Sequence, residues 1–140
     1  MFRKILVAND GSEGGTKALA AAIAVAKAFA AELHCISVKE RPSHFAETVG
    51  EVMEEREESE KLFHRVCSES VNQAREAGVE LKCEIRAGHE VETIIRLARD
   101  GHFDLLVVGF MGHSRVFDRI WGGTSQNLTR LAPCSVLLVK

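Results

Sequence analysis

Four glycines follow a short apolar run in a pattern that could hold a phosphate group. The run covers residues 105–108 and is followed by Gly109, Gly112, Gly122 and Gly123. Glycine has no Cβ atom, so backbone N–H groups at such turns can approach phosphate oxygens closely. A tight turn without a ligand is the alternative for Gly109 and Gly112 alone. With the second glycine pair included, the pattern favours nucleotide binding.

Hydroxyl and basic side chains accompany the glycines. Thr124 and Ser125 stand at the expected start of a helix, where side-chain hydroxyls and free N–H groups favour an anion. Arg115 and Arg119 could balance phosphate charge, or they could be ordinary surface arginines. These residue types match the chemistry that a phosphate group requires.

A second polar turn, Asn9-Asp10, follows the apolar run at residues 4–8. Asp10 could contact a nucleoside hydroxyl or a metal-bound water. It could instead form the turn, or cap the next helix together with Ser12. We expect this turn to lie beside the glycine turn at Gly109, with the two flanking a cleft.

The elements that would position these turns alternate between strand and helix patterns. Strands are predicted at residues 4–8, 32–38, 79–86, 105–108 and 135–139, and helices at residues 12–31, 54–77, 89–100 and 124–132. Residues 39–53 have no clean period and predict a loop with local helix. The alternation predicts an open α/β fold in which a parallel sheet has helices on both faces. Residues 79–86 alternate apolar and charged side chains, which is typical of an edge strand.

Length and composition place limits on the class of protein. The chain has 140 residues, 46% of them hydrophobic and 27% charged, and predicts one domain over residues 1–140. The net charge of −2 gives no general attraction to nucleic acid or to an anionic membrane surface. The apolar run near the N-terminus is too short for a signal peptide or a membrane span, so we expect a cytoplasmic protein.

The four cysteines are predicted to be free thiols. Cys35, Cys67, Cys83 and Cys134 are far apart in the sequence and form no CxxC pair. Several lie in apolar segments, where buried free cysteine is common. Neither a metal site nor a disulfide is expected. The histidines also lack metal-ligand spacing.

Over essentially its whole length the chain resembles the universal stress protein family. The resemblance is carried by the segment ILVANDGS, by the spacing Gly109-x2-Gly112-x9-Gly122 with small residues after it, and by the terminal APCSVLLVK. It implies a five-stranded parallel sheet of order 3-2-1-4-5 with a Rossmann-like arrangement, and a homodimer. The glycine spacing marks the members of that family that bind ATP or a related adenine nucleotide, so the resemblance implies ATP or AMP as ligand, with or without Mg²⁺.

The resemblance also implies which residues meet the nucleotide. Asn9 and Asp10 would contact the nucleoside, and Val38 would hold the adenine through its backbone. The full implied set is Ala8, Asn9, Asp10, Val38, Val108, Gly109, Gly112, Gly122, Gly123, Thr124 and Ser125. Gly123 departs from the family pattern, which usually has serine or threonine there, and so removes one hydroxyl contact.

Three functions remain open from the sequence. The favoured one is a dimeric, ligand-responsive stress or signalling protein that binds adenine nucleotide and acts on a downstream protein partner. The alternatives are a dimeric adaptor of the same family without a nucleotide, and a slow nucleotide hydrolase using Asp10 and magnesium. The chain has no GxxxxGK[ST] motif and no GxGxxG after the first strand, which excludes a P-loop NTPase and a standard dinucleotide fold. We therefore expect no enzyme beyond slow ATP hydrolysis. The homodimer is expected to form through the edge strand at residues 135–139.

Overall fold

The chain forms a five-stranded parallel sheet in the order β3-β2-β1-β4-β5. The structure is a computed structural model that describes residues 1–40, 49–110 and 123–140. The strands are β1 (Lys4–Ala8), β2 (Glu32–Lys39), β3 (Leu81–Ala87), β4 (Leu105–Gly109) and β5 (Ser135–Val139). The predicted strand order is confirmed, and β3 is an edge strand as its alternating pattern indicated.

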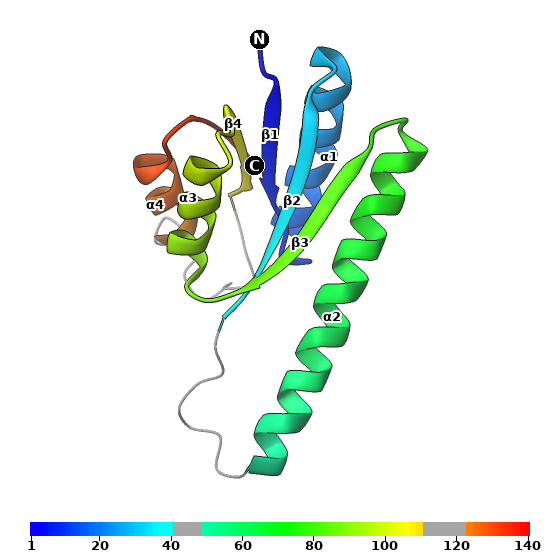
Figure 1. Ribbon diagram of the computed structural model, residues 1–140, viewed down its shortest axis with the longest axis vertical. Coiled ribbons are helices and arrows are strands. Elements are labelled where there is room, and N and C mark those ends of the chain that lie inside the picture. Colours follow the sequence, from blue (N-terminus) through cyan, green and yellow to red (C-terminus); the bar gives the residue numbers. More distant parts are fainter. Residues whose placement is uncertain (41–48, 111–122) are drawn as a thin grey trace.

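Four helices cover the two faces of this sheet (Figure 1). They are α1 (Glu13–Phe29), α2 (Val49–Glu76), α3 (Glu90–Asp100) and α4 (Gly123–Leu131). Residues of α1 and α2 join one buried apolar cluster, while residues of α3 and α4 join another on the opposite face. The predicted open α/β architecture is therefore confirmed.

Strand β1 lies at the centre of the sheet and is buried on both faces. Ile5 and Val7 contribute to the cluster under α1 and α2, while Leu6 contributes to the cluster under α3 and α4. A strand that is covered on both sides needs a continuous apolar run, which is why this segment does not alternate. Backbone N–H groups of Arg3 and Lys4 donate to the Asp104 carboxylate at 2.9 and 3.1 Å, and so tie the start of β1 to the start of β4.

Helix α1 begins where Ser12 caps it. The Ser12 hydroxyl accepts a hydrogen bond from the Gly15 N–H at 3.1 Å. Ala18, Ala22 and Ala26 form a small-residue face that is buried against the sheet. Small side chains let the helix axis approach the strands closely, so the polar turn before α1 is held against the carboxyl edge of the sheet.

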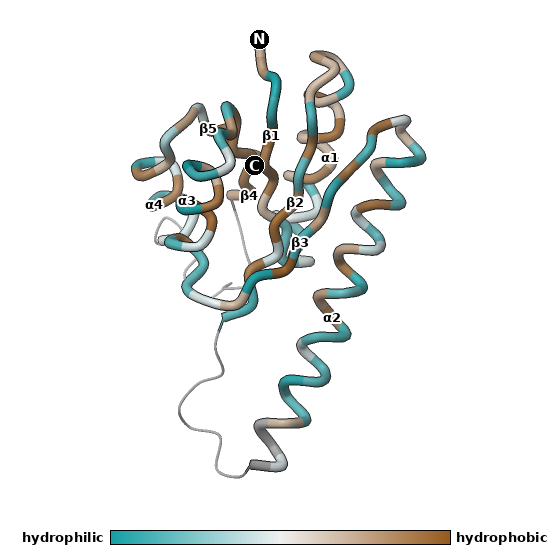
Figure 2. Tube along the Cα trace, in the orientation of Figure 1, coloured by the Kyte–Doolittle hydropathy of each residue, from teal (hydrophilic) through white to brown (hydrophobic). Residues whose placement is uncertain are grey.

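Helix α2 begins at Val49, five residues before the predicted start, and is longer than expected. Its first half extends past the carboxyl end of β2 (Figure 1) and is largely hydrophilic (Figure 2). Burial within the described part of α2 starts at Val66 and continues through Ser70 and Ala74. Only the second half of this helix therefore packs on the sheet.

Two of the four cysteines are bonded, so the prediction of four free thiols is wrong for Cys67 and Cys83. They form a disulfide between α2 and β3, with their Cα atoms 5.7 Å apart. The sequence separation of 16 residues gave no sign of this contact, because it arises only when α2 folds back over the edge strand. Cys35 and Cys134 are free thiols, as predicted.

Candidate functional site

The polar turn after β1 and the glycine end of β4 are neighbours at the carboxyl edge of the sheet. The two strands pair in register from Ile5 opposite Leu105 to Val7 opposite Val107. The strand order reverses here, because β2 follows β1 on one side while β4 lies on the other. Ligands of open α/β proteins bind at such a point. The expected placement of these two strand ends side by side is confirmed, while residues 111 and 112 of the second turn lie outside the described residues.

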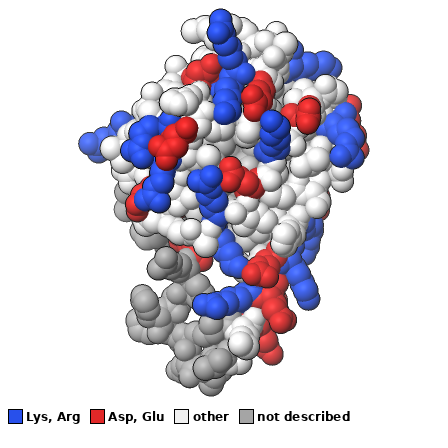
Figure 3. Space-filling model, viewed as in Figure 1, with Lys and Arg blue, Asp and Glu red and all other residues white. Residues whose placement is uncertain are grey.

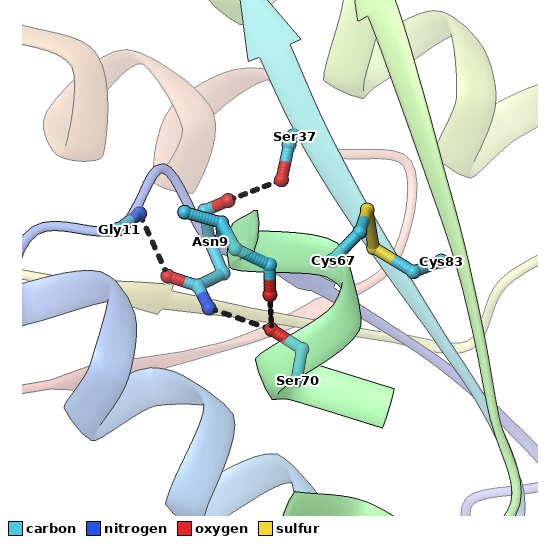
Figure 4. Close-up of a disulfide and its surroundings, with 7 residues drawn as sticks. Asn9, Gly11, Ser37, Cys67, Ser70 and Cys83 are labelled. Carbon is cyan, nitrogen blue, oxygen red and sulfur yellow. Dashed lines mark hydrogen bonds between the residues drawn. A yellow bond between two sulfur atoms is a disulfide. The ribbon is translucent and has the colours of Figure 1, made fainter. Parts of the chain in front are cut away.

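Asn9 builds the turn by bonding to three separate segments (Figure 4). Its side-chain Nδ2 donates to Ser70 Oγ on α2 at 3.1 Å, and its Oδ1 accepts from the Gly11 N–H at 3.0 Å. Its carbonyl oxygen accepts from Ser37 Oγ on β2 at 2.6 Å. Asn9 is 5% exposed, and an unpaired amide there would be costly. The amide therefore faces α2 and fixes the turn, while its predicted contact with a nucleoside stays a prediction.

Asp10 has a structural contact at its place beside Asn9. Its carboxylate accepts a hydrogen bond from the Ser12 N–H at 2.9 Å, the bond of a turn former. The residue is half-buried. A Cβ atom on Gly15 would come within 2.5 Å of Asn9 Oδ1 and 3.0 Å of Asp10 Oδ1, so the missing side chain of Gly15 gives the turn its room. Asp10 has the position and the charge to meet a polar ligand group as well.

Gly109 stands where β4 and α1 approach most closely. A Cβ atom at this position would lie within 2.5 Å of the Gly14 carbonyl carbon and 2.9 Å of its Cα atom. Non-bonded contacts as short as these are essentially never made by a Cβ atom, so the close approach needs glycine at this position. The preceding residue, Val108, is buried on the other face of the sheet, in the cluster under α3 and α4. The missing side chain of Gly109 thus lets the first turn of α1 pack directly against the end of β4.

Ser125 joins the start of α4 to the end of β4. Its hydroxyl donates to the Gly109 carbonyl oxygen at 2.7 Å. The first N–H groups of a helix have no intrahelical acceptor, so this contact places free donors at the same edge of the sheet. Gly123 is exposed and Thr124 is half-buried in this first turn. Gly123, Thr124 and Ser125 are therefore brought to the predicted site, with the Ser125 hydroxyl directed toward the protein.

Val38 presents backbone groups beyond the end of β1. The pairing of β1 with β2 ends at Ala8 opposite Ile36, and the Ile36 carbonyl oxygen accepts from the Asn9 N–H at 3.1 Å. Alternate residues of a parallel strand direct their N–H and C=O groups to the same neighbour. Val38 therefore directs its groups toward the β1 side, where β1 has already ended. An adenine ring could use such an edge.

Gly112 and Gly122, the other two predicted glycine positions, lie outside the described residues, as do Arg115 and Arg119. The described part of the chain, residues 1–40, 49–110 and 123–140, holds no group of three or more metal-ligating side chains. Within those same ranges no helix is long and apolar enough to cross a membrane. Basic and acidic side chains are interspersed over the face drawn in Figure 3.

Three residues that position the site were not among the predicted site residues. Ser70 and Ser37 bond to Asn9, and Gly14 makes room for Gly109. A signal for Ser70 was present, because its hydroxyl falls on the apolar face of a predicted helix. Its partner Asn9 lies 61 residues away in the sequence, which the pattern could not identify.

Comparisons with known proteins agree with this geometry. The family model described as the Universal stress protein family matches residues 1–140. Universal stress protein YxiE of Bacillus subtilis is 30% identical over 154 aligned residues, covering 100% of both chains. The fold is also that of universal stress protein UspA from Lactobacillus plantarum, with a TM-score of 0.89, 22% identity and coverage of 99% of this chain and 98% of that one.

Two further solved structures were determined with nucleotides. A universal stress protein in complex with cAMP has a TM-score of 0.78 and 26% identity, covering 99% of this chain and 97% of that chain. An Arabidopsis thaliana family protein with AMP bound has a TM-score of 0.71 and 19% identity, covering 99% of this chain and 91% of that chain. With the family model matching over the full length, the chain belongs to the universal stress protein family.

Proposed function

We propose that this chain binds an adenine nucleotide at the junction of β1 and β4. The observation that carries the proposal is the hydrogen bond from Ser125 to the Gly109 carbonyl oxygen, which brings the N-terminus of α4 to the end of β4. Glycine at a strand end beside a helix N-terminus is suited to phosphate oxygens. The Val38 edge lies on the opposite side of the Asn9-Asp10 turn, where a base could pair with the backbone. The cAMP complex of the 26% identical relative supports the same ligand class.

The proposed ligand is ATP or AMP. Mg²⁺ commonly binds through one or two carboxylates, substrate phosphates and water, so the Asp10 carboxylate is the right type of group to assist it. Binding without rapid turnover is the proposed role, because nucleotide that stays bound can stabilise one state of a protein over another. Turnover of about one per second or faster, within the usual range for enzymes, would instead favour the hydrolase alternative.

We further propose that the protein acts as a cytoplasmic homodimer which passes its nucleotide state to a downstream protein. Strand β5 is an edge strand, and Leu137 in its centre is 36% exposed. An apolar edge strand is an aggregation hazard unless something pairs with it. A second copy pairing with β5 would remove that hazard. An adaptor without nucleotide remains the second candidate, and Gly123 is the observation in its favour, because it offers no hydroxyl to a phosphate.

Nucleotide release on denaturation tests the proposed function. Protein purified without added nucleotide is expected to yield ATP or AMP when it is denatured and chromatographed, and the emptied protein is expected to bind ATP by calorimetry. A chain that neither releases nor binds ATP, AMP or cAMP at millimolar concentration would have the adaptor role instead.

The Gly123→Ser substitution tests the phosphate position. Among the described residues outside its own helix turn, nothing lies within 4 Å of a Cβ atom placed on Gly123, so these residues leave room for serine. Its hydroxyl is expected to tighten ATP binding by about 0.5–1.5 kcal/mol, or roughly two- to twelvefold in Kd. Gly123→Ala is the matched control, because it adds the Cβ atom without the hydroxyl. Equal Kd values for the two variants would argue against a phosphate at this helix terminus.

A further inference from the structure

We propose that the Cys67–Cys83 disulfide is a site of reversible thiol–disulfide exchange. Its redox state sets how firmly α2 holds the turn from Asn9 to Gly11. Through that turn it sets the affinity for nucleotide. The part of this inference that concerns nucleotide rests on the function proposed above.

The disulfide is the covalent link between α2 and the sheet. Cys67 lies in the second half of the helix, near the point where burial begins, and Cys83 lies in the edge strand β3. An edge strand has a neighbouring strand on one side only, so a helix packed over it has less to hold it than a helix over the sheet centre. The bond therefore acts where the docking of α2 is weakest.

The same helical turn that carries Cys67 also holds the polar turn of the candidate site (Figure 4). Ser70 Oγ accepts from Asn9 Nδ2 at 3.1 Å and donates to the Val66 carbonyl oxygen at 2.6 Å. Val66 Cγ2 lies 2.8 Å from the place where a Cβ atom on Gly11 would stand. A shift of this helical turn would thus move both ends of the Asn9–Gly11 segment.

Reduction should loosen this contact without releasing the helix. Ala74 is fully buried and Val71 packs against the same apolar cluster, so the last turns of α2 stay docked. The helix before Cys67 has few buried residues to hold it. Local opening of weakly packed segments costs less free energy than global unfolding. The helical turn at residues 66–70 lies between the docked last turns of α2 and the weakly packed part before Cys67.

The bonded pair can be reached by a reductant, while the neighbouring free thiol is inert. Cys67 and Cys83 are both half-buried. Cys35 is the register partner of Cys83 in the sheet but is fully buried, and this burial raises the pKa of its thiol to about 12. It stays protonated at neutral pH and does not attack the disulfide, because the thiolate is the reactive form. The exchange therefore stays confined to one pair.

The exchange needs a dithiol reductant and balances as follows. A thiolate of the reductant attacks one sulfur of the pair, the Cys67–Cys83 bond breaks, and the departing cysteine thiolate takes up a proton. The second reductant thiol, once deprotonated, resolves the mixed disulfide, which frees the other cysteine as a thiol. The protein gains two electrons and two protons, and the reductant is oxidised to its own disulfide.

The bonded state is the one that should bind nucleotide more tightly. In it, α2 holds Asn9 and Gly11 in place before a ligand arrives. A ligand that binds the reduced protein must also order this turn, and the free-energy cost of that ordering weakens its binding. The predicted direction is thus weaker binding after reduction.

The experiment compares ATP binding by the full chain in the two redox states. Calorimetry is run on protein with the disulfide intact and after dithiothreitol, with the state checked by titration of free thiols. The Kd for ATP is expected to rise at least about fivefold on reduction, the lower end of typical coupling between sites. The double variant C67S/C83S should give the weaker Kd with or without dithiothreitol. Cys134→Ser is the matched control and should keep the difference, because Cys134 joins the cluster on the opposite face.

A second measurement separates this inference from the proposed function. Hydrogen exchange of the Gly11 amide, which donates to Asn9 Oδ1, is followed without nucleotide. Faster exchange after reduction supports the control of the turn by α2, even for protein that binds no ATP, AMP or cAMP in either state. The absence of ATP, AMP and cAMP binding in both states would refute the proposed function but not the control of the turn by α2. ATP binding with the same measurable Kd in the two states, or equal exchange of the Gly11 amide, would overturn the inference.

Discussion

Replacing Gly109 by alanine is expected to lower the free energy of unfolding by about 2–3 kcal/mol, toward the upper end of the usual cost of overpacking. The added Cβ atom would stand within 2.5 Å of the Gly14 carbonyl carbon. These neighbours are backbone atoms of the first turn of α1, which Ser12 caps and which the alanine face holds on the sheet. They cannot move aside as a flexible side chain would. Urea unfolding measures the change, with an unaltered m-value showing that two-state behaviour is kept.

Gly123→Ala provides the control for this substitution. It adds the same methyl group at the same edge of the sheet, but the new Cβ atom meets no atom of the described neighbouring segments within 4 Å. Its free energy of unfolding should stay within about 0.5 kcal/mol of the parent, as for most surface changes. Should Gly109→Ala be equally mild, the close approach of β4 and α1 would not be what requires glycine. The same comparison in ATP binding would show whether the packing of Gly109 against α1 also matters for the proposed ligand.

Loss of the Cys67–Cys83 bond is expected to lower stability by about 3 kcal/mol, the cost for a closed loop of about 15 residues in the chain-entropy account. The bond closes a segment with a sequence separation of 16, and it restricts the unfolded chain. At roughly 2–4 °C for each kcal/mol, the Tm should fall by about 6–12 °C. Thermal unfolding followed by circular dichroism, with and without a phosphine reductant, measures the shift.

The double variant C67S/C83S distinguishes this effect from a general effect of the reductant. Its Tm should match that of the reduced parent and should not change when the reductant is added. A parallel fall in the Tm of the variant would assign the loss to another cause. This stability change and the change in nucleotide affinity are separate measurements, because one reads global unfolding and the other reads a single turn.

The fold could be predicted because its strands carry strong local patterns. The continuous apolar runs of β1 and β4 require burial on both faces, and the alternating run of β3 requires a wet face. The start of α2 was placed too late, because residues 39–53, which contain Pro42 and Gly50, have no clean helical period. The disulfide was missed for a related reason. Which residue of a long helix faces which residue of an edge strand depends on tertiary packing, and local periodicity contains no such information.

For the site, the sequence predicted that the ends of β1 and β4 lie side by side, but not where the side chains of Asn9 and Ser125 point. Asn9 and Ser125 were expected to meet the ligand. Their side chains bond to Ser70 on α2 and to the Gly109 carbonyl oxygen, and their predicted contacts with a ligand stay predictions. Residue type identifies a polar group, whereas its direction depends on partners that are distant in the sequence. Ser70, for example, lies 61 residues from Asn9.

The central place of β1 has a consequence for synthesis of the chain. Its neighbour on one side, β4, begins with Leu105 opposite Ile5, so the two strands are separated by about 100 residues along the chain. At roughly 5–20 residues per second, a ribosome needs on the order of 5–20 s to make that intervening stretch. During this time one edge of an apolar strand has no partner, and such edges invite association with other chains. The newly made chain is therefore most prone to aggregation before β4 has emerged, and chaperone protection is most valuable in that interval.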